Sequence, residues 1–336
     1  MKKRADGRYQ KSITINGKRT VFYGKNIAEL NRKIIEYREK EKNGKSFFEV
    51  CDEWEKEHFE NLEYTTKVRY NTPIEYAKKE FKNVYINDIT PDDVDLYIKK
   101  CVSKGYSSKS VKMFFSVLGM IFKHAYIKRY IKVNPCLYLT IPSNLPKSSR
   151  KPLTKEEIKI VNKSIDKTFG FFAYFLLYTG LRRGEALALM YEDIDFENKE
   201  INVNKSVYYE SNTPKIKTPK TESGNRKVIL IDCLSKCIQK GKNGYIFCND
   251  DGTLLGNSKV TRYWTKYKEE TGLDITPHQL RHTYASILFD AGISDKDAQD
   301  LMGHSDITIT KNIYVHISKE RKKKTAETLN DYVVKM

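Results

Sequence analysis

Residues 179–185 read TGLRRGE, and the apolar run FFAYFLLY at 171–178 precedes them directly. An apolar run of this length predicts a buried helix. Gly180 is the residue type that most often ends a helix, because glycine adopts the left-handed backbone conformation without a steric penalty. Arg182 would then lie in the turn beyond the helix, where its guanidinium can reach a ligand.

Three later strings carry further charged and polar groups. They are TPKTESGNRKVIL at 218–230, HQLRH at 278–282 and MGHSD at 302–306, and a tyrosine follows ten residues after the histidine of the last string. Pro277 marks the start of a helix, which places Arg281 near the positive end of the helix dipole. The candidate site residues are Arg182, Lys220, His278, Arg281, His304 and Tyr314.

These side chains supply two guanidiniums, one ammonium, two imidazoles and a phenol. Phosphodiester transfer places extra negative charge on the non-bridging oxygens, so the site needs fixed positive donors, and the arginine fork matches that geometry. A phenol that attacks phosphorus forms a phosphotyrosyl ester, which conserves bond energy and can be reversed by a hydroxyl. The set therefore favours strand transfer over plain hydrolysis.

Several of these residues are not the only candidates of their type for the role in the site. Lys220 lies at an expected hairpin tip, but Lys215, Lys217 and Lys227 are its neighbours in the sequence. Tyr314 is one of 23 tyrosines. A single arginine is more often a surface or salt-bridge residue than a ligand, so the combination carries the interpretation. We interpret His282 as a structural hydrogen-bonding residue.

The composition points to an anionic polymer as partner. The chain has 336 residues, and its 61 Lys and Arg outnumber its 43 Asp and Glu, for a formal charge of +18. Residues 1–45 alone hold fourteen basic and five acidic residues. A Lys-rich solvated surface gives the same excess, so charge alone does not decide.

The sequence also predicts several absences. The longest apolar run is too short for a membrane span. The basic N-terminus is not followed by the apolar region of a signal peptide, so we expect a cytoplasmic protein. The six cysteines are scattered without paired metal-ligand spacing, so neither a disulfide nor a metal site is expected.

Two modules are expected ahead of the site. Asn16-Gly17 between two β-rich runs predicts a hairpin over 9–23, and a helix should follow from the capping pair Asn26 and Glu29. Helices are then expected over 46–59, 65–81, from Thr90, and over 107–130, which together form a bundle. The basic residues expected to contact DNA are Arg8, Lys11, Lys18, Arg19, Lys109 and Lys112, for which solvated side chains are the alternative.

The fold class is therefore multidomain and mainly α. A sheet-plus-helix domain over 1–45 and a helical bundle over 46–140 precede a Pro-broken basic linker over 141–153. A mixed α+β domain with a C-terminal tail should cover 154–336, with one small antiparallel sheet between 195 and 231. Its helices are expected over 156–164, 169–178, 232–240, 258–271, 279–291, 294–302, 308–315 and 318–334.

In order and spacing, TGLRRGE, the Lys-bearing PKT segment, HQLRH, MGHSD and ITKNIYVH at 309–316 resemble the tyrosine recombinases of the phage-integrase type. The resemblance covers 154–316 closely and the whole architecture more loosely. The chain looks like the three-domain integrases of temperate phages and conjugative transposons. In that family the N-terminal domain binds arm-type DNA sites and the bundle grips the core site.

The resemblance implies a role for each residue of the site. Tyr314 would be the nucleophile, Arg182 and Arg281 the phosphate clamps, and Lys220 the general acid. His278 would assist proton transfer, His304 would donate to the phosphate, and Glu185 would orient the site. No metal or other cofactor is implied. The expected partners are double-stranded DNA, three further copies of the chain in a tetramer, an excisionase and a DNA-bending host protein.

Two departures from the family pattern lie near the nucleophile. Met302 stands where leucine is frequent and Asp306 where serine is frequent. Neither residue belongs to the implied chemistry.

Two other functions stay open: a sequence-specific DNA-binding regulator without catalysis, and a type IB topoisomerase-like enzyme that acts as a monomer.

Overall fold

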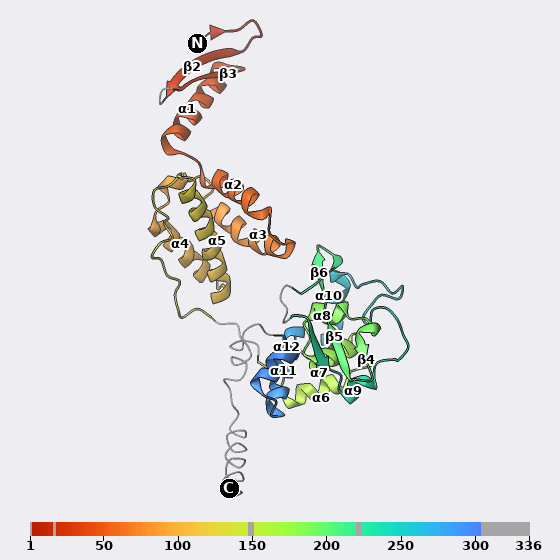
Figure 1. Ribbon diagram of the computed structural model, residues 1–336. Coiled ribbons are helices and arrows are strands. Elements are labelled where there is room, and N and C mark those ends of the chain that lie inside the picture. The colour runs from red at the N-terminus through yellow and green to blue at the C-terminus, as the bar shows by residue number, and fades with distance from the viewer. Residues whose placement is uncertain (1, 16–17, 147–150, 220–223, 304–336) are drawn as a thin grey trace. The chain divides into compact units, whose positions relative to one another are not determined.

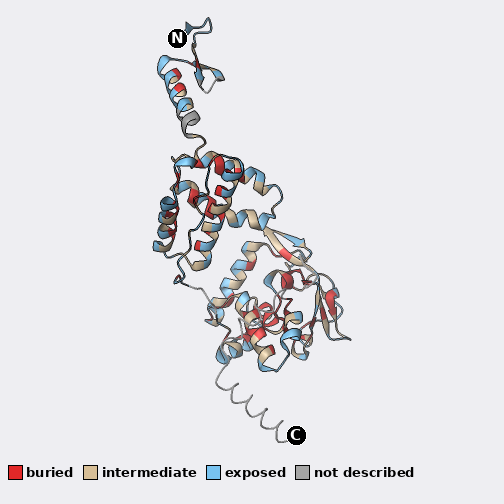
Figure 2. Ribbon diagram, turned by 60° about the vertical axis from the view of Figure 1, so that its left-hand side comes forward, coloured by how far each residue is buried: buried red, intermediate tan, exposed pale blue. Residues whose placement is uncertain are grey.

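The computed structural model describes residues 2–15, 18–146, 151–219 and 224–303. The chain divides into two compact units, Met1–Ser149 and Arg150–Met336 (Figure 1). Buried residues gather in the interior of each unit (Figure 2). The division falls inside the segment 141–153 that was expected to link two domains.

The N-terminal part of the first unit is a small sheet with one helix. Strands β1 (Lys2–Lys3), β2 (Tyr9–Ile15) and β3 (Lys18–Gly24) are antiparallel in the order β1-β2-β3. Helix α1 (Ile27–Asn43) packs on the sheet through Leu30 and Ile34, which bury Ile13. The predicted hairpin strands and helix are confirmed. Strand β1 was not predicted, because two lysines carry no β-strand signal.

Strand alternation separates the basic residues of this sheet into two faces. Tyr9, Ile13 and Phe22 pack toward α1, and Lys11 has the same parity as Tyr9 and Ile13. Arg19 pairs with Thr14 on the opposite face, and its side chain is exposed. Of these two predicted DNA contacts, only Arg19 lies on the face turned away from the helix.

The bundle consists of the four predicted helices, α2 (Phe47–Phe59), α3 (Tyr64–Glu80), α4 (Pro91–Ser103) and α5 (Ser108–Ile127). A short 3-10 helix, η1 (Ile86–Asp88), precedes α4. Complete capping boxes begin two of the helices: Ser46 with Glu49 at α2, and Thr90 with Asp93 at α4. Helix α5 supplies the centre of the core through Val111, Phe114, Val117, Leu118, Ile121, Phe122 and Ala125.

The chain on either side of residues 147–150 packs against its own unit. Leu145 is buried in the bundle core, and the Pro146 carbonyl accepts a hydrogen bond from the Ser108 backbone. On the other side, Leu153 is buried in the core of the second unit and its backbone N–H donates to Thr283 Oγ1 at 2.9 Å. Both ends of the basic segment are therefore anchored.

The second unit begins with helices around one buried helix. Helix α7 (Gly170–Thr179) lies at the centre of the core. In the sequence, α6 (Lys155–Lys163) precedes it, and it is followed by α8 (Arg183–Ala188) and the 3-10 helix η2 (Tyr191–Asp193). Helices α10 (Asn257–Thr271), α11 (Pro277–Asp290) and α12 (Asp295–Met302) follow the strands. The mainly α, multidomain fold class is confirmed.

The strands of this unit form two sheets where one was predicted. Strands β4 (Ile194–Asp195), β5 (Glu200–Val203) and β8 (Arg226–Ile229) make one antiparallel sheet in that order. Strands β6 (Ser206–Glu210) and β7 (Thr213–Lys217) pair only with each other among the described strands. The strands before and after Lys220 belong to different sheets, and Lys220 itself, which was predicted at a hairpin tip, lies outside the described residues.

One helix is shorter than predicted. Helix α9 spans only Asp232–Ser235, although the sequence predicted a helix to residue 240. Leu234 is the buried apolar residue of α9, and Ile238, which is also buried, lies beyond the end of the helix. Gly241 then adopts a φ of +79°. The helices predicted over 308–315 and 318–334 lie outside the described residues.

Candidate active site

The site is built on the junction between α7 and α8, where two glycines permit close packing. Gly180 ends α7 with a φ of +63°, and a Cβ there would lie 2.2 Å from Cδ1 of Tyr284 on α11. A Cβ on Gly184 would lie 2.4 Å from the Val207 carbonyl oxygen of β6. The two glycines of TGLRRGE therefore let the end of α7 approach α11 and let α8 approach β6.

Arg182 is the residue that precedes α8, and Glu185 holds it there. The Glu185 carboxylate accepts hydrogen bonds from the Arg182 backbone N–H at 2.8 Å and from Arg182 Nη1 at 2.7 Å. Arg182 Nη2 donates to the Gly303 carbonyl at 3.0 Å. The Arg182 side chain is 47% exposed, so the guanidinium also faces solvent.

Arg281 lies just beyond the first turn of α11, which Thr276 caps and Pro277 begins. Its guanidinium donates to the Gly180 carbonyl at 2.6 Å and to the Met302 carbonyl. Burial, and then the neighbouring Arg182 charge, lower the pKa of Arg281 to about 9, while Glu185 opposes that shift. The group therefore remains cationic at pH 7.

A third arginine, Arg226 on β8, completes the cluster and was not among the predicted site residues. Its Nη1 and Nη2 donate to the two oxygens of Glu185 at 3.3 and 2.9 Å, and its Nε donates to the Leu301 carbonyl at 2.9 Å. Alternation along the strand offered a signal, because Val228 and Leu230 share its parity and are buried. A charged residue on the buried face of a strand requires a partner.

Glu185 is the carboxylate that these arginines share. Burial alone would raise its pKa, but the hydrogen bond from Arg226 and the charges of Arg226 and Arg182 outweigh that effect and lower the pKa to about 2. The Glu185 side chain is only 7% exposed. It is therefore a permanently charged counter-ion inside the cluster at neutral pH.

The end of α12 joins the cluster through its backbone. The carbonyls of Leu301, Met302 and Gly303 accept from Arg226, Arg281 and Arg182, respectively. The last carbonyls of a helix have no partner within it and form the negative end of its dipole, which favours cations. Gly303 ends α12 with a φ of +61°. His304 is the next residue in the chain.

The two histidines of HQLRH lie together on α11. The rings of His278 and His282 are 4.3 Å apart in an edge arrangement. Burial, and then the charges of His278 and Arg281, lower the pKa of His282 to about 4, so His282 is neutral at pH 7. His278 lies in the first turn of α11, one turn before Arg281.

Three of the predicted site residues, Lys220, His304 and Tyr314, lie outside the described residues. The structure therefore brings Arg182, Glu185 and Arg281 together, with His278 on the same helix as Arg281. The ends of the segment that contains Lys220 meet, since a Cβ on Gly224 would lie 2.4 Å from Cβ of Pro219.

The predicted DNA contacts of the first unit differ in exposure. Arg8 is exposed and forms an ion pair with Asp6 at 2.8 Å, and Lys18 begins β3. Lys109 and Lys112 are exposed on α5, and Lys109 lines a groove with Arg69 of α3. Lys109, Lys112 and Arg69 are therefore accessible to a macromolecular partner.

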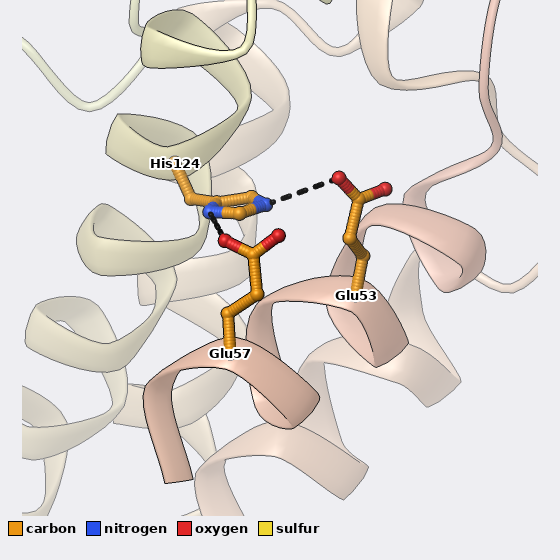
Figure 3. Close-up of side chains that lie close together, drawn as sticks. All are labelled: Glu53, Glu57 and His124. Atoms are coloured by element: carbon orange, nitrogen blue, oxygen red, sulfur yellow. Dashed lines mark ion pairs between the residues drawn. The ribbon is translucent and has the colours of Figure 1, made fainter. Parts of the chain in front are cut away.

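Among the described residues, one group offers three metal-ligating side chains within 4.8 Å of one another: Glu53, Glu57 and His124. Figure 3 shows the imidazole between the two carboxylates, with N–O distances of 3.7 Å to Glu53 and 3.9 Å to Glu57. Lys45 already pairs with Glu53, and Lys128 pairs with Glu57 at 2.7 Å. A metal ion would compete with both lysines, so the group is better described as an ion-pair network that joins α2 to α5.

Comparison with known proteins decides the family. A model of the phage integrase family matches residues 151–321, and a model of the phage integrase N-terminal SAM-like domain matches 46–102. The chain belongs to the phage integrase family. A XerC-like tyrosine recombinase of Caldanaerobacter subterraneus subsp. tengcongensis is 30% identical over 97% of this chain and 96% of its own length. The resemblance found in the sequence is confirmed, and the protein is a tyrosine site-specific recombinase.

Mobile-element proteins are among the similar proteins. The transposase of transposon Tn916 from Enterococcus faecalis is 27% identical over 74% of this chain and 70% of its own length. The integrase of transposon Tn1549, solved in complex with circular intermediate DNA, has a TM-score of 0.69 at 21% identity, covering 84% of this chain and 99% of that chain. These relatives support a recombinase of a mobile element.

The fold is also that of a phage enzyme. A lambda integrase dimer bound to a core site has a TM-score of 0.64 at 19% identity, covering 92% of this integrase and 93% of that chain.

Among the described helices, none is long and apolar enough to cross a membrane.

Proposed function

We propose that this integrase cuts and rejoins DNA through a 3′-phosphotyrosyl intermediate, with Tyr314 as the nucleophile. The observation that supports the proposal is the joint contact of Arg182 and Arg281 with the carbonyls of Gly303 and Met302, immediately before His304. Two fixed guanidiniums on the carbonyls that precede His304 in the sequence suit a scissile phosphate, whose negative charge increases in the transition state.

In the proposed reaction, the phenolic oxygen of Tyr314 attacks phosphorus, and the bond from phosphorus to the 5′ oxygen breaks. Lys220 supplies the proton that the leaving 5′ oxygen takes up. The ester conserves the energy of the broken bond, so the 5′ hydroxyl of another strand can attack it and release the phenol. Exchange of strands needs no external energy source.

The remaining residues support this transfer. Arg182 and Arg281 balance the charge on the non-bridging oxygens, and His304 donates a further hydrogen bond. His278 assists proton transfer from its position one turn before Arg281. Glu185 orients Arg182, because its carboxylate accepts from both the backbone and the side chain of that residue.

The proposal extends to the whole chain. Residues 1–45 would bind arm-type DNA, 46–140 the core site, and 154–336 would carry catalysis, with 141–153 as the linker between the last two. Solved relatives include a lambda integrase tetramer bound to a Holliday junction, which supports a homotetramer on DNA. An excisionase and a DNA-bending host protein would set the direction of recombination in the cytoplasm of a bacterial host.

The test is covalent capture on a nicked suicide duplex that contains the core site. Wild-type protein should yield a protein–DNA adduct that survives denaturing electrophoresis. Tyr314→Phe should form none while it binds the duplex with unchanged affinity, because the change removes only the nucleophilic oxygen. Tyr178→Phe is the matched control, since that hydroxyl donates to Asn162 outside the site. An adduct from Tyr314→Phe would refute the assignment, and adducts without exchange between two duplexes would favour a topoisomerase-like enzyme.

A further inference from the structure

We propose that Arg226 is a positioning residue that holds Arg182 and the end of α12 in fixed relation. The inference rests on the proposed role of Arg182 as a phosphate clamp. Arg226 itself donates to Glu185 and to the Leu301 carbonyl, and its side chain is only 6% exposed. Arg226 therefore fixes the positions of other site residues through buried contacts and does not touch the phosphate.

The first connection runs through Glu185. Arg226 binds both carboxylate oxygens as a fork, and one of these oxygens, Oε1, also accepts from Arg182 Nη1. If the fork were lost, the buried carboxylate would depend on Arg182 alone. Arg182 would then be drawn toward Glu185, which would withdraw its guanidinium from the solvent-facing position in which it can meet a phosphate.

The second connection runs to α12. Arg226 Nε donates to the Leu301 carbonyl, three residues before His304. One guanidinium thus links strand β8, helix α8 and the last turn of α12. Because β8 begins two residues after Gly224, it also anchors one end of the segment that contains Lys220. A displacement of about 1 Å among catalytic groups can reduce a rate by about 100-fold.

Two substitutions in the full-length protein separate charge from geometry. Arg226→Lys keeps the positive charge but loses the planar fork, and Arg226→Met keeps the apolar stem but loses the charge. Arg262→Met is the matched control, because Arg262 is an exposed arginine of α10 in the same unit. Adduct formation is measured under single-turnover conditions with saturating protein, together with core-site affinity and thermal melting.

We expect Arg226→Met to form the adduct about 100-fold more slowly, with core-site affinity changed less than about threefold. Arg226→Lys should fall between this variant and the wild type, and Arg262→Met should match the wild type. A rate for Arg226→Met within threefold of wild type at saturation would overturn the proposal. If Arg226→Met does not fold, the same criterion applies to Arg226→Lys.

A second substrate distinguishes positioning from general destabilisation. A methylphosphonate at the scissile position removes the charge that Arg182 and Arg281 balance, so the ratio of wild-type to variant rate should shrink by at least tenfold. An unchanged ratio would mean that Arg226 only supports the fold. Wild-type protein that forms no adduct, or Tyr314→Phe protein that forms one, would instead be a failure of the proposed function.

Discussion

Glu185 is the carboxylate at the centre of the arginine cluster, and its negative charge balances the positive charges around it. Arg182 and Arg226 both donate to it, and its charge also stabilises the cationic form of Arg281. A buried carboxylate with such partners stabilises the folded state only while it is ionised. Its contribution to stability should therefore depend on pH in a defined direction.

We predict that Glu185→Gln lowers the free energy of unfolding by about 3 kcal/mol at pH 7, because two buried or half-buried guanidiniums lose their counter-ion. The folded-state pKa of about 2 lies below the ordinary value of 4.5. The stabilisation is therefore complete above about pH 4.5 and is lost as the pH falls toward 2. Urea unfolding of both proteins at several pH values should show the difference shrink over this window.

The control for this measurement is Glu200→Gln. Glu200 pairs with Lys227 on the surface of the β5–β8 sheet, where both side chains are partly exposed. An exposed pair contributes about 0 to 1 kcal/mol. A difference for Glu185→Gln that stayed constant from pH 7 to pH 3 would contradict the assigned role of its charge.

At the residue scale, the sequence predicted the side chains of the candidate site better than the residue that holds them in place. Arg182, Glu185 and Arg281 were identified from motif strings, and the structure brings them together. Arg226 was missed because its neighbours in the sequence, Asn225 and Lys227, are exposed polar residues, so the segment looked like a solvated turn. Its partner Glu185 is 41 residues away, and no local pattern encodes that pairing.

At the scale of elements, the contact between α7 and α11 depends on the absence of a side chain at Gly180. The Tyr284 ring occupies the space that a Cβ would need, and the φ of +63° is itself unfavourable for other residues. This contact also fixes the Gly180 carbonyl that accepts from Arg281. Gly180 thus joins the packing of α7 on α11 to the placement of Arg281.

We predict that Gly180→Ala destabilises the second unit by more than 2 kcal/mol and slows adduct formation. Backbone strain accounts for about 1 kcal/mol of this, and the clash with Tyr284 for the remainder. Gly292→Ala is the matched control, since Gly292 has a φ of +81° after α11 but open space around its Cβ position. Thermal melting that gave equal losses for the two variants would exclude the steric contribution.

Capping and periodicity predicted most elements, because these signals are local. At the start of α1, the Glu29 backbone N–H donates to Asn26 Oδ1 at 2.8 Å, as the predicted capping pair requires. The boxes Ser46 with Glu49, Thr90 with Asp93 and Thr154 with Glu157 also begin helices. The division of the predicted sheet into two could not be predicted in this way, because strand partners are chosen by long-range packing. The pairing of β5 with β8, across the whole β6–β7 hairpin, is such a choice.

At the scale of the whole molecule, each unit has its own core and its own tryptophan. The chain has two tryptophans. Trp54 lies in the bundle core at 3% exposure, and Trp264 packs against the core of the second unit, where its indole N–H donates to the Ile275 carbonyl at 3.0 Å. Each indole therefore reports on the folding of one unit.

We predict that the single-tryptophan variants Trp54→Phe and Trp264→Phe unfold in denaturant with different fluorescence midpoints, because separate cores need not unfold together. Adding Gly180→Ala should shift the midpoint that Trp264 reports and leave the Trp54 midpoint unchanged. Identical shifts at both tryptophans would show that the units unfold as one cooperative block.

The contacts at the end of α12 determine which substitutions in this helix the enzyme can tolerate. Three arginines grip the main chain of residues 301–303, and a carbonyl oxygen is the same whatever side chain its residue bears. Replacements such as methionine for leucine at 302 therefore leave the alignment intact. Substitutions in α12 that keep the buried positions Ala298 and Met302 apolar should therefore preserve the contacts with the three arginines.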